Sequence, residues 1–318
     1  MSRITTLGRI ELFGWLVVAG LVLMAVAYPV QHILSASQKA RDVQLAIAQN
    51  AVEARATATF NAFLYTLQGD WEQLQILSET IAETPPEQLA AALRVFARDG
   101  GRISWVGFAD AQGIIRAAAN DVLLGRDVSA RPWFQQGMTA PFGGNAHEAV
   151  LLSEVLGRPK GEPFRLLDLA APVRDAEGRI LGVIGAHISV GWAEDFLKKG
   201  AGAAKIRVAI LNGKGEAEID PERLLQGKVW TGATLPPDAP AAGWMTWPDG
   251  QSNITVLVPE TTLPGMPRFG WTLLARLDAD VFPDVRKSVL TDLQTAILIG
   301  ASVLAVAVTG GFVLARLR

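Results

Sequence analysis

Hydrophobic residues are concentrated in two long runs near the ends of the chain, at 12–30 and 295–315. Each run approaches the ~20 apolar residues that a helix needs to cross ~30 Å of hydrocarbon. Arginines flank both runs on their outer sides: Arg3, Arg9, Arg316 and Arg318. Because cytoplasmic flanks carry the excess of positive charge, both ends of the chain are predicted to be cytoplasmic, with residues 31–294 outside the cytoplasm.

The first run is longer than the ~7–15-residue apolar core of a cleaved signal peptide. The residues after it, at 28–32, read YPVQH and lack the small-x-small pattern of a cleavage site. We therefore expect an uncleaved membrane anchor and a bacterial inner-membrane location, with the main domain in the periplasm.

Residues 35–83 contain no Pro and only one Gly, Gly69, which predicts a long helix. The part of this helix closer to the first run has an apolar stripe of alanines: Ala51, Ala54 and Ala58. This stripe could pack equally well against a second copy of the helix in a homodimer or against the chain's own domain. Farther along, large apolar residues recur at helical spacing and predict a face buried against the domain: Phe60, Phe63, Leu64, Leu67, Trp71, Leu74, Leu77 and Ile81.

Helix signals also occur farther along the chain. Thr84 is positioned to act as the N-cap of a second helix that continues to about residue 98. Another helix is predicted at 192–199, followed by a Gly/Ala-rich linker at 200–204. The Pro/Ala-rich residues 234–243 are predicted to form a loop.

The external region also contains three strand–turn–strand patterns. Each turn has an Asp or Asn that can cap it and a Gly that accepts positive φ. Two more strands are predicted at 254–258 and 270–277. Together these patterns predict an α+β fold with two antiparallel-sheet subdomains, whose paired strands are 103–109 with 114–119, 167–173 with 179–190, and 206–211 with 216–220.

Composition narrows the range of functions. The net charge of −2 gives no indication of a nucleic-acid surface. The sequence contains no cysteine, which excludes thiol catalysis, thiolate metal sites and disulfides. The external domain must therefore be stabilised by its hydrophobic core.

Two segments resemble the double-Cache sensor regions of bacterial chemoreceptors, histidine kinases and diguanylate cyclases. Residues 124–134 read LGRDVSARPWF and are similar to that family's loop entering its pocket helix. Residues 171–175 (APVRD) and 182–189 (GVIGAHIS) are similar to its central strands. The resemblance implies a double-Cache (PAS-like) region between two transmembrane helices, with a small-metabolite pocket in the membrane-distal subdomain.

In amino-acid-binding members of this family, an Arg and a Trp of the pocket loop hold the ligand carboxylate, and Arg131 and Trp133 match them. The chain departs from the pattern that grips an amino group, because no Tyr follows Tyr65 and His187 replaces a late Asp. An ammonium group needs acceptors, so Arg131 with His187 suits an anionic metabolite better. The candidate ligand-binding residues are Arg131, Trp133, Phe134, His147, Asp168 and His187.

Each of these residues also has a structural interpretation. Arg131 could clamp its loop to a backbone carbonyl. Trp133 and Phe134 are expected to belong partly to the core. His147 and His187, taken singly, are better explained as ordinary buried or edge histidines than as ligand-binding residues. Asp168 lies among apolar neighbours in its strand, so a structural partner is as plausible for it as a ligand.

The predicted function is an inner-membrane sensor that relays ligand binding to a cytoplasmic output domain or a separate signalling partner. No enzyme, metal or cofactor signature is recognised, because His147-Glu148 lacks the second His of a zincin helix. Two alternatives remain: an anchored interaction or assembly module without a ligand, and an anchored periplasmic enzyme. The predicted segments are cytoplasmic at 1–11, transmembrane at 12–30, long helix at 31–84, distal Cache at 85–200, proximal Cache at 201–280, connecting helix at 281–294, transmembrane at 295–315 and cytoplasmic at 316–318.

Overall fold

The structure is a computed structural model in which one compact unit, Gln49–Ala279, contains all of the strands. A second unit combines Met1–Ala48 with Asp280–Arg318. The described residues are 3–98, 101–157, 164–225, 228–230 and 241–277, together with short runs and single residues between 291 and 309.

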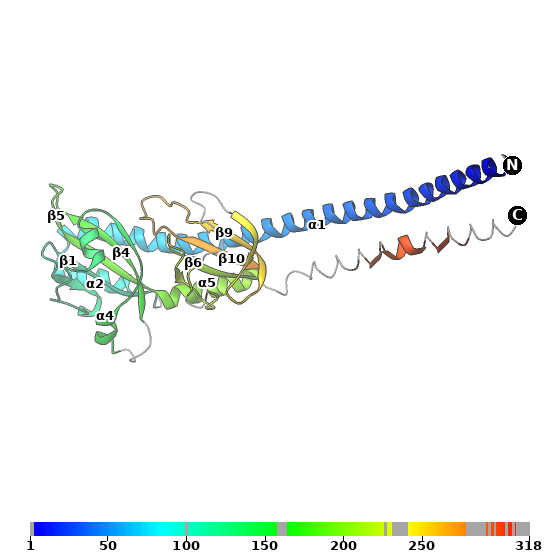
Figure 1. Ribbon diagram of the computed structural model, residues 1–318. Coiled ribbons are helices and arrows are strands. Elements are labelled where there is room, and N and C mark those ends of the chain that lie inside the picture. Colours follow the sequence, from blue (N-terminus) through cyan, green and yellow to red (C-terminus); the bar gives the residue numbers. More distant parts are fainter. Residues whose placement is uncertain are drawn as a thin grey trace. The chain divides into compact units, whose positions relative to one another are not determined.

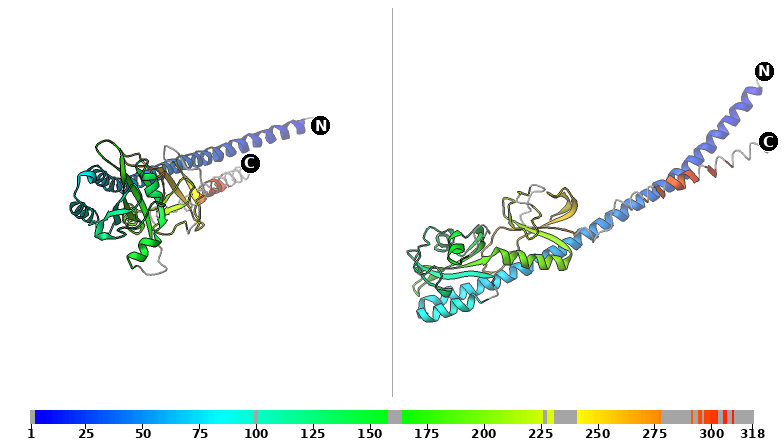
Figure 2. Two further views of the ribbon diagram at one scale, coloured as in Figure 1. Left: turned by 90° about the vertical axis from the view of Figure 1, so that its left-hand side faces the viewer. Right: turned by 90° about the horizontal axis from the view of Figure 1, so that it is seen from below.

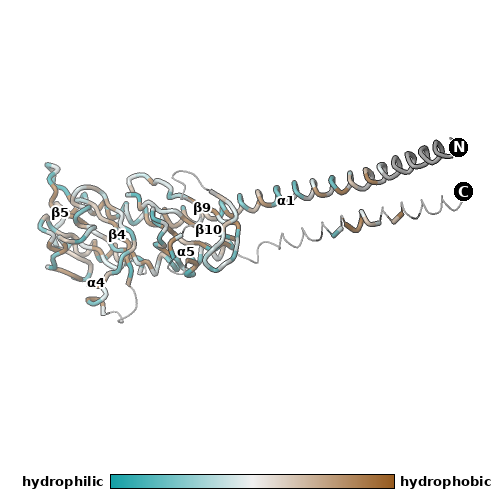
Figure 3. The backbone as a smooth tube through the Cα atoms, in the orientation of Figure 1, coloured by the Kyte–Doolittle hydropathy of each residue, from teal (hydrophilic) through white to brown (hydrophobic). Residues whose placement is uncertain are grey.

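The long predicted helix is present as α1 (Arg3–Thr80), which is followed by a single 3-10 turn, η1 (Ile81–Glu83). Figure 3 shows hydrophilic and hydrophobic residues interspersed along the coloured part of α1 that precedes the sheets. The rings of Trp192 and Trp271 both stack on Phe63, at 6.0 and 6.1 Å between centroids. The prediction that the stripe packs on the chain's own domain is confirmed for its fully buried members: Phe60, Phe63, Leu64, Leu67, Trp71 and Leu74.

The next helix, α2 (Pro86–Phe96), begins differently from the prediction. Its N-cap is Pro85, and the hydroxyl of Thr84 donates instead to the carbonyl of Thr80, at 2.6 Å. The capping role predicted for Thr84 is therefore wrong, because the hydroxyl reaches back to the preceding helical turn.

The first sheet is antiparallel, with strand order β2-β1-β5-β4-β3 (Figure 1). The hairpins predicted from the first two strand–turn–strand patterns are confirmed, whereas β3 falls in a segment for which no strand was predicted. Short helices α3 (Pro132–Gly137) and α4 (Val150–Val155) flank β3 in the sequence, and a 3-10 turn, η2 (Ala119–Asp121), follows β2. The strands are β1 (Ile103–Asp110), β2 (Ile115–Ala118), β3 (Phe142–Glu148), β4 (Arg165–Arg174) and β5 (Ile180–Ser189).

The second sheet repeats this arrangement, with strand order β7-β6-β10-β9-β8 and antiparallel pairing throughout. In the right-hand view of Figure 2 the green first sheet and the yellow-to-orange second sheet follow one another along the cyan and blue helix. The loop predicted at 234–243 is wrong at its end, because 241–243 pair with β9 despite their Ala/Gly composition. The strands are β6 (Ile206–Leu211), β7 (Ala217–Ile219), β8 (Ala241–Thr246), β9 (Ser252–Pro259) and β10 (Thr272–Leu277).

Helix α5 (Val190–Ala204) joins the two sheets. The Ser189 hydroxyl accepts the backbone N–H of Trp192 and caps its first turn. The helix ends at Lys205, which has a left-handed conformation with φ of 56°. Residues 200–204, predicted as a linker, therefore form the last turns of α5, and β6 begins directly after the cap.

Polar contacts also join the two sheets. The backbone N–H of Ala146 on β3 donates to the Glu218 carboxylate on β7, at 2.8 Å. The indole N–H of Trp271 donates to the side-chain oxygen of Asn145, at 2.9 Å. Strand β3 therefore contacts the second sheet as well as its own.

The predicted first span, 12–30, is helical within α1. Among the described residues, no helix is both long and apolar enough to cross a membrane. The predicted connecting helix at 281–294 and second span at 295–315 lie largely outside the described residues.

Candidate functional site

One row of residues crosses the first sheet from β3 to β1. The strand register places Gly144 opposite Asp168, Asp168 opposite His187, and His187 opposite Trp105. Directly opposed residues point to the same face of a sheet, so these side chains share one face. The register shift after Gly144 also brings His147 opposite Leu166, two residues before Asp168 and on the same face.

Asp168 and His187 form a buried pair at the centre of this row. One carboxylate oxygen of Asp168 lies 2.7 Å from Nδ1 of His187, and the side chains are only 5% and 10% exposed. The other oxygen lies 3.6 Å from Nδ1 of His147, whose side chain is 44% exposed. A carboxylate at Nδ1 leaves Nε2 of His187 as the ring nitrogen available to a ligand.

Aromatic rings enclose His187. Trp105 stacks on the imidazole with 4.9 Å between centroids, and Trp133 approaches it edge-on at 5.8 Å. The indole N–H of Trp105 is satisfied by the carbonyl of Val122, so its ring presents only an apolar face. The imidazole is thus the polar group within an aromatic wall.

The loop entering α3 supplies the remaining residues. Pro132 occupies the first turn of α3, and Arg131 is its N-cap in an extended conformation. Trp133 lies directly over Gly185 of β5, where a Cβ atom would approach the indole to 2.7 Å. Phe134 contacts Trp133 edge-on and belongs to the hydrophobic core cluster of this sheet.

A cavity of about 200 Å³ opens on this face of the sheet. Five of the six candidate residues line it, whereas Phe134 supports it from the core. The lining also includes Trp105, Asn145 and Glu148, which sequence analysis did not identify. Trp105 could have been found from strand register alone, since it lies opposite His187. The candidate residues brought together at the cavity are Arg131, Trp133, His147, Asp168 and His187.

The arrangement can hold a small molecule in a defined orientation. Arg131 is exposed and lines the cavity, so its guanidinium is available to a carboxylate or another oxyanion. The Asp168–His187 pair supplies a fixed hydrogen-bonding group inside an apolar enclosure. Among the residues that the structure describes, no cluster of three or more His, Asp or Glu side chains could hold a metal ion.

Searches for relatives by sequence found no match among protein-family profiles. None of the curated proteins matches the sequence either.

Solved structures, by contrast, are similar in fold. The ligand-binding domain of the Pseudomonas aeruginosa PAO1 amino acid chemoreceptor PctC, in complex with GABA, is 19% identical, with 72% of this chain and 99% of that chain covered and a TM-score of 0.54. The Pseudomonas fluorescens chemoreceptor CtaA domain, in complex with L-alanine, is 17% identical, with 73% and 97% covered and a TM-score of 0.55. A protein described as methyl-accepting chemotaxis protein X is 16% identical, with 74% and 99% covered and a TM-score of 0.55.

These similarities concern the fold. They confirm the predicted resemblance to double-Cache ligand-binding domains of chemoreceptors, with a long N-terminal helix and two antiparallel five-stranded sheets.

Proposed function

We propose that this protein is a membrane-anchored sensor whose first-sheet cavity binds a small anionic metabolite. The observation that carries the proposal is the buried Asp168–His187 pair inside an aromatic wall, with Arg131 lining the same cavity. A buried ionisable pair costs desolvation energy, so its place at a cavity rather than in a filled core supports a binding role.

The ligand is a compact carboxylate. The cavity is smaller than the ~300–1,000 Å³ pockets that hold drug-sized ligands. Arg131 pairs with the anionic group, while Nε2 of His187 contacts a second polar group of the ligand. The Asp168 oxygens already face two histidines, which leaves them poorly placed to receive an ammonium group.

Amino acids are nevertheless the second candidate class. Sequence analysis disfavoured them because His187 replaces an acidic residue, but Asp168 supplies a carboxylate directly opposite on the neighbouring strand. The neighbouring domains PctC and CtaA were solved with GABA and L-alanine. An amino acid would bind here with its ammonium group close to the Asp168–His187 pair.

Signal relay is the second part of the proposal. The apolar segments 12–30 and 295–315 anchor the external domain in the inner membrane, and α1 connects the first segment to the packed core. Ligand binding shifts the domain between two states, which requires different ligand affinities in those states. The displacement passes along α1 or the C-terminal segment to a cytoplasmic output domain or partner.

A homodimer suits this relay. Ala54 and Ala58 are exposed on α1, and small side chains allow two helices to approach closely. Because the sequence contains no cysteine, Ala54→Cys would introduce a single thiol. Disulfide-linked dimers of this variant under mild oxidation support the dimer, whereas a monomeric product contradicts it.

A thermal-shift screen of the purified chain tests the ligand proposal. The library contains small carboxylates, phosphorylated metabolites, amino acids and amines. A ligand at ~100 times its Kd adds ~2.7 kcal/mol of stability, and at ~2–4 °C per kcal/mol the midpoint should rise by ~5–10 °C. The expected result is a shift with a carboxylate that disappears in Arg131→Ala.

Arg126→Ala is the matched control, since Arg126 is exposed in the same loop and is not part of the cavity lining. This variant should keep the full ligand-induced shift. A shift with amines but not carboxylates would contradict the anionic class. No shift with any compound, in a chain that unfolds cooperatively, would favour an interaction module without a ligand.

A further inference from the structure

The second sheet has its own cavity, which residues of three neighbouring strands line. Both sheets have the same strand order, so β10 corresponds to β5 and β6 corresponds to β1. His187 lies between Trp105 and Asp168 in the first sheet. In the second, Arg276 occupies the equivalent place, opposite Arg207 on β6 and Thr255 on β9.

Arg276 and His187 also lie on corresponding faces of their sheets. Arg276 is two residues from Leu274 and therefore on the same face of the second sheet, where Leu274 belongs to the hydrophobic core cluster. His187 is likewise two residues from Gly185, over which Trp133 of the first cluster packs. Each sheet therefore carries a polar group at the end of its core-forming face.

Arg276 is a buried cation with spare hydrogen-bonding capacity. Its side chain is 6% exposed, and Nη2 donates to the carboxylate of Asp249, at 2.7 Å. The guanidinium lies 4.5 Å from the ring centroid of Trp247, which fixes its plane. Its other terminal nitrogen, Nη1, has no hydrogen-bond partner among the described residues.

A second unsatisfied donor lies close by. The side-chain nitrogen Nδ2 of Asn253 on β9 is also buried without a partner among the described residues. Both Asn253 and Arg276 line a cavity of about 160 Å³. Buried donors without acceptors are costly and rare in folded proteins, so two at one cavity indicate an acceptor that occupies it.

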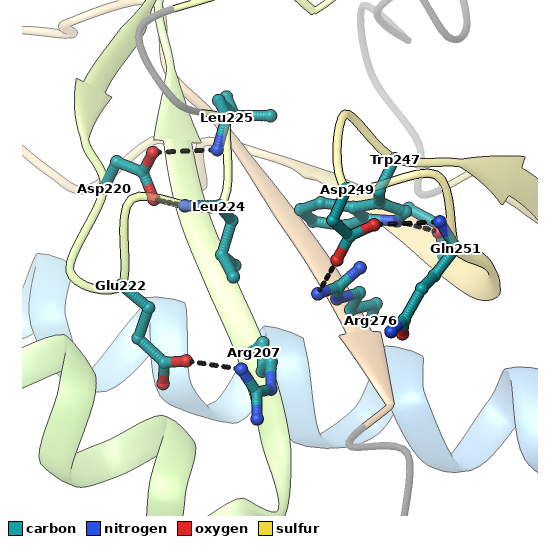
Figure 4. A network of polar contacts seen from close by, with 10 residues as sticks. Arg207, Asp220, Glu222, Leu224, Leu225, Trp247, Asp249, Gln251 and Arg276 are labelled. Atoms are coloured by element: carbon teal, nitrogen blue, oxygen red, sulfur yellow. Dashed lines mark hydrogen bonds and ion pairs between the residues drawn. The ribbon is translucent and has the colours of Figure 1, made fainter.

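The cavity lining carries charged groups of both signs. Arg207 and Arg276 supply guanidinium groups and Asp249 supplies a carboxylate, and the Arg207 guanidinium also pairs with Glu222, at 3.0 Å. Figure 4 shows Asp249, Gln251 and Arg276 close together beside the indole of Trp247, with Arg207 on the neighbouring strand. Asp249 already pairs with Arg276 through Nη2, so Nη1 is left for an incoming group.

We propose that this second-sheet cavity is a binding site for a small oxyanion, held by Nη1 of Arg276 and Nδ2 of Asn253. Both hydrogen bonds are charge-assisted because the acceptor is an anion, and the guanidinium adds a full positive charge. The site is separate from the proposed ligand cavity, because no residue lines both.

Calorimetric titration of the purified full chain with inorganic phosphate tests the proposal, and acetate serves as a second, smaller oxyanion. The decisive variant is Asn253→Asp, which removes the donor and places a negative charge against the anion. Loss of one hydrogen bond to an ionised group weakens binding by ~10-fold or more. The wild type should bind one phosphate per chain at this site, and Asn253→Asp should weaken that binding at least ~10-fold.

Two controls separate binding from folding. Asn253→Leu removes the donor without adding charge and should also weaken binding, which keeps the test valid if the Asp variant unfolds. Asn50→Asp makes the same chemical change at an exposed position of α1 and should bind phosphate as the wild type does.

Three results would overturn the proposal. The first is that the wild type shows no saturable binding of phosphate or acetate. The second is that both Asn253 variants bind as tightly as the wild type. The third is that Arg131→Ala loses all binding. The last result would place the anion in the first-sheet cavity. Because Arg131→Ala does not touch the second sheet, failure of this proposal is distinguishable from failure of the ligand proposal.

Discussion

Glu260 gives a quantitative test of how the second sheet is held against β3. Its buried carboxylate, which follows β9, accepts hydrogen bonds from three consecutive backbone N–H groups. The distances are 3.1 Å to Phe269, 2.7 Å to Gly270 and 3.1 Å to Trp271. These residues form part of the contact with the first sheet, because Phe269 packs close to Gly143 and Trp271 bonds to β3.

Glu260→Ala should therefore destabilise the fold measurably. The backbone N–H groups of Phe269 and Trp271 lie in buried residues and would lose their acceptor. Each buried unsatisfied donor costs ~1–3 kcal/mol, so the expected loss of unfolding free energy is ~2–6 kcal/mol. Glu260→Gln keeps one oxygen as an acceptor, so its loss of unfolding free energy should be smaller than that of Glu260→Ala. Some loss is still expected, because the new amide N–H would face the N–H of Phe269.

Urea unfolding of the purified chain, followed by far-ultraviolet circular dichroism, measures these losses. Glu177→Ala is the matched control, because the Glu177 side chain is 68% exposed. That control should remain within ~0.5 kcal/mol of the wild type. A Glu260→Ala variant as stable as the Glu177→Ala control would refute the assignment of Glu260 as the acceptor that organises this loop.

Three other perturbations have defined outcomes. Gly185→Ala places a Cβ atom 2.7 Å from the Trp133 indole, and the displaced ring should cost ~1–3 kcal/mol in urea unfolding and change the tryptophan emission; unchanged emission would contradict this packing. The hydrogen bond from Arg276 lowers the pKa of Asp249, so its contribution to stability is present above the ordinary Asp value of ~3.9 and is lost as the pH falls through the lowered value. The stability difference between wild type and Asp249→Asn should therefore shrink on acidification, and a difference that grows would contradict the sign. Glu218→Ala removes the acceptor of a β3 backbone N–H, so hydrogen exchange in the β3 peptide should accelerate, whereas unchanged exchange would show that this contact does not restrain β3.

Much of the fold could be predicted from the sequence, because local signals and burial agreed. The apolar stripe of α1 has helical spacing, and its members from Phe60 to Leu74 are almost all buried. The hairpins β1–β2, β4–β5 and β6–β7 each carry an Asx–Gly turn between apolar strands. At the first turn the carboxylate of Asp110 accepts the backbone N–H groups of Gln112 and Ile114, as the pattern predicts.

The missed strands lack these local signals. β3 has the sequence FGGNAHE, whose two glycines and polar residues disfavour a strand on propensity alone. It forms because β4 supplies a partner and because Phe269, in the loop before β10, packs on Gly143. β8 similarly takes its strand conformation from pairing with β9 rather than from its Ala- and Gly-containing sequence. Non-local pairing of this kind cannot be read from a window of sequence.

The site was predictable in its residue types and less so in its connections. Arg131, Trp133 and the histidines were identified from motifs, but the role of Asp168 depends on register. The one-to-one pairing of β4 with β5 places its carboxylate at His187, so an acidic group lies beside the position where His187 replaces the expected Asp. Asn145 was not identified because β3 was not predicted.

Strand β3 brings the first-sheet cavity and the second sheet into direct connection. Asn145 lines the cavity and accepts the indole N–H of Trp271, while the next backbone N–H, of Ala146, donates to Glu218. His147 follows immediately and lines the cavity again. A ligand that displaces the backbone at His147 should therefore strain the bonds of the two preceding residues to the second sheet.

The bond to Glu218 continues into the second sheet. Glu218 also accepts Nδ2 of Asn212, whose side-chain oxygen receives the backbone N–H groups of Lys214 and Glu216 in the β6–β7 turn. Coupling requires an element with two arrangements that both sites bias, and β3 is the strand that lines the first cavity and also bonds to the second sheet. Suppose that phosphate in the second-sheet cavity favours one arrangement of β3. Thermodynamic linkage then requires two factors to be equal: the factor by which the first-cavity ligand changes phosphate affinity, and the factor by which phosphate changes the affinity for that ligand. The same factor in both titrations, different from one, would establish the coupling. A factor of one in both would show that the two cavities bind their ligands independently.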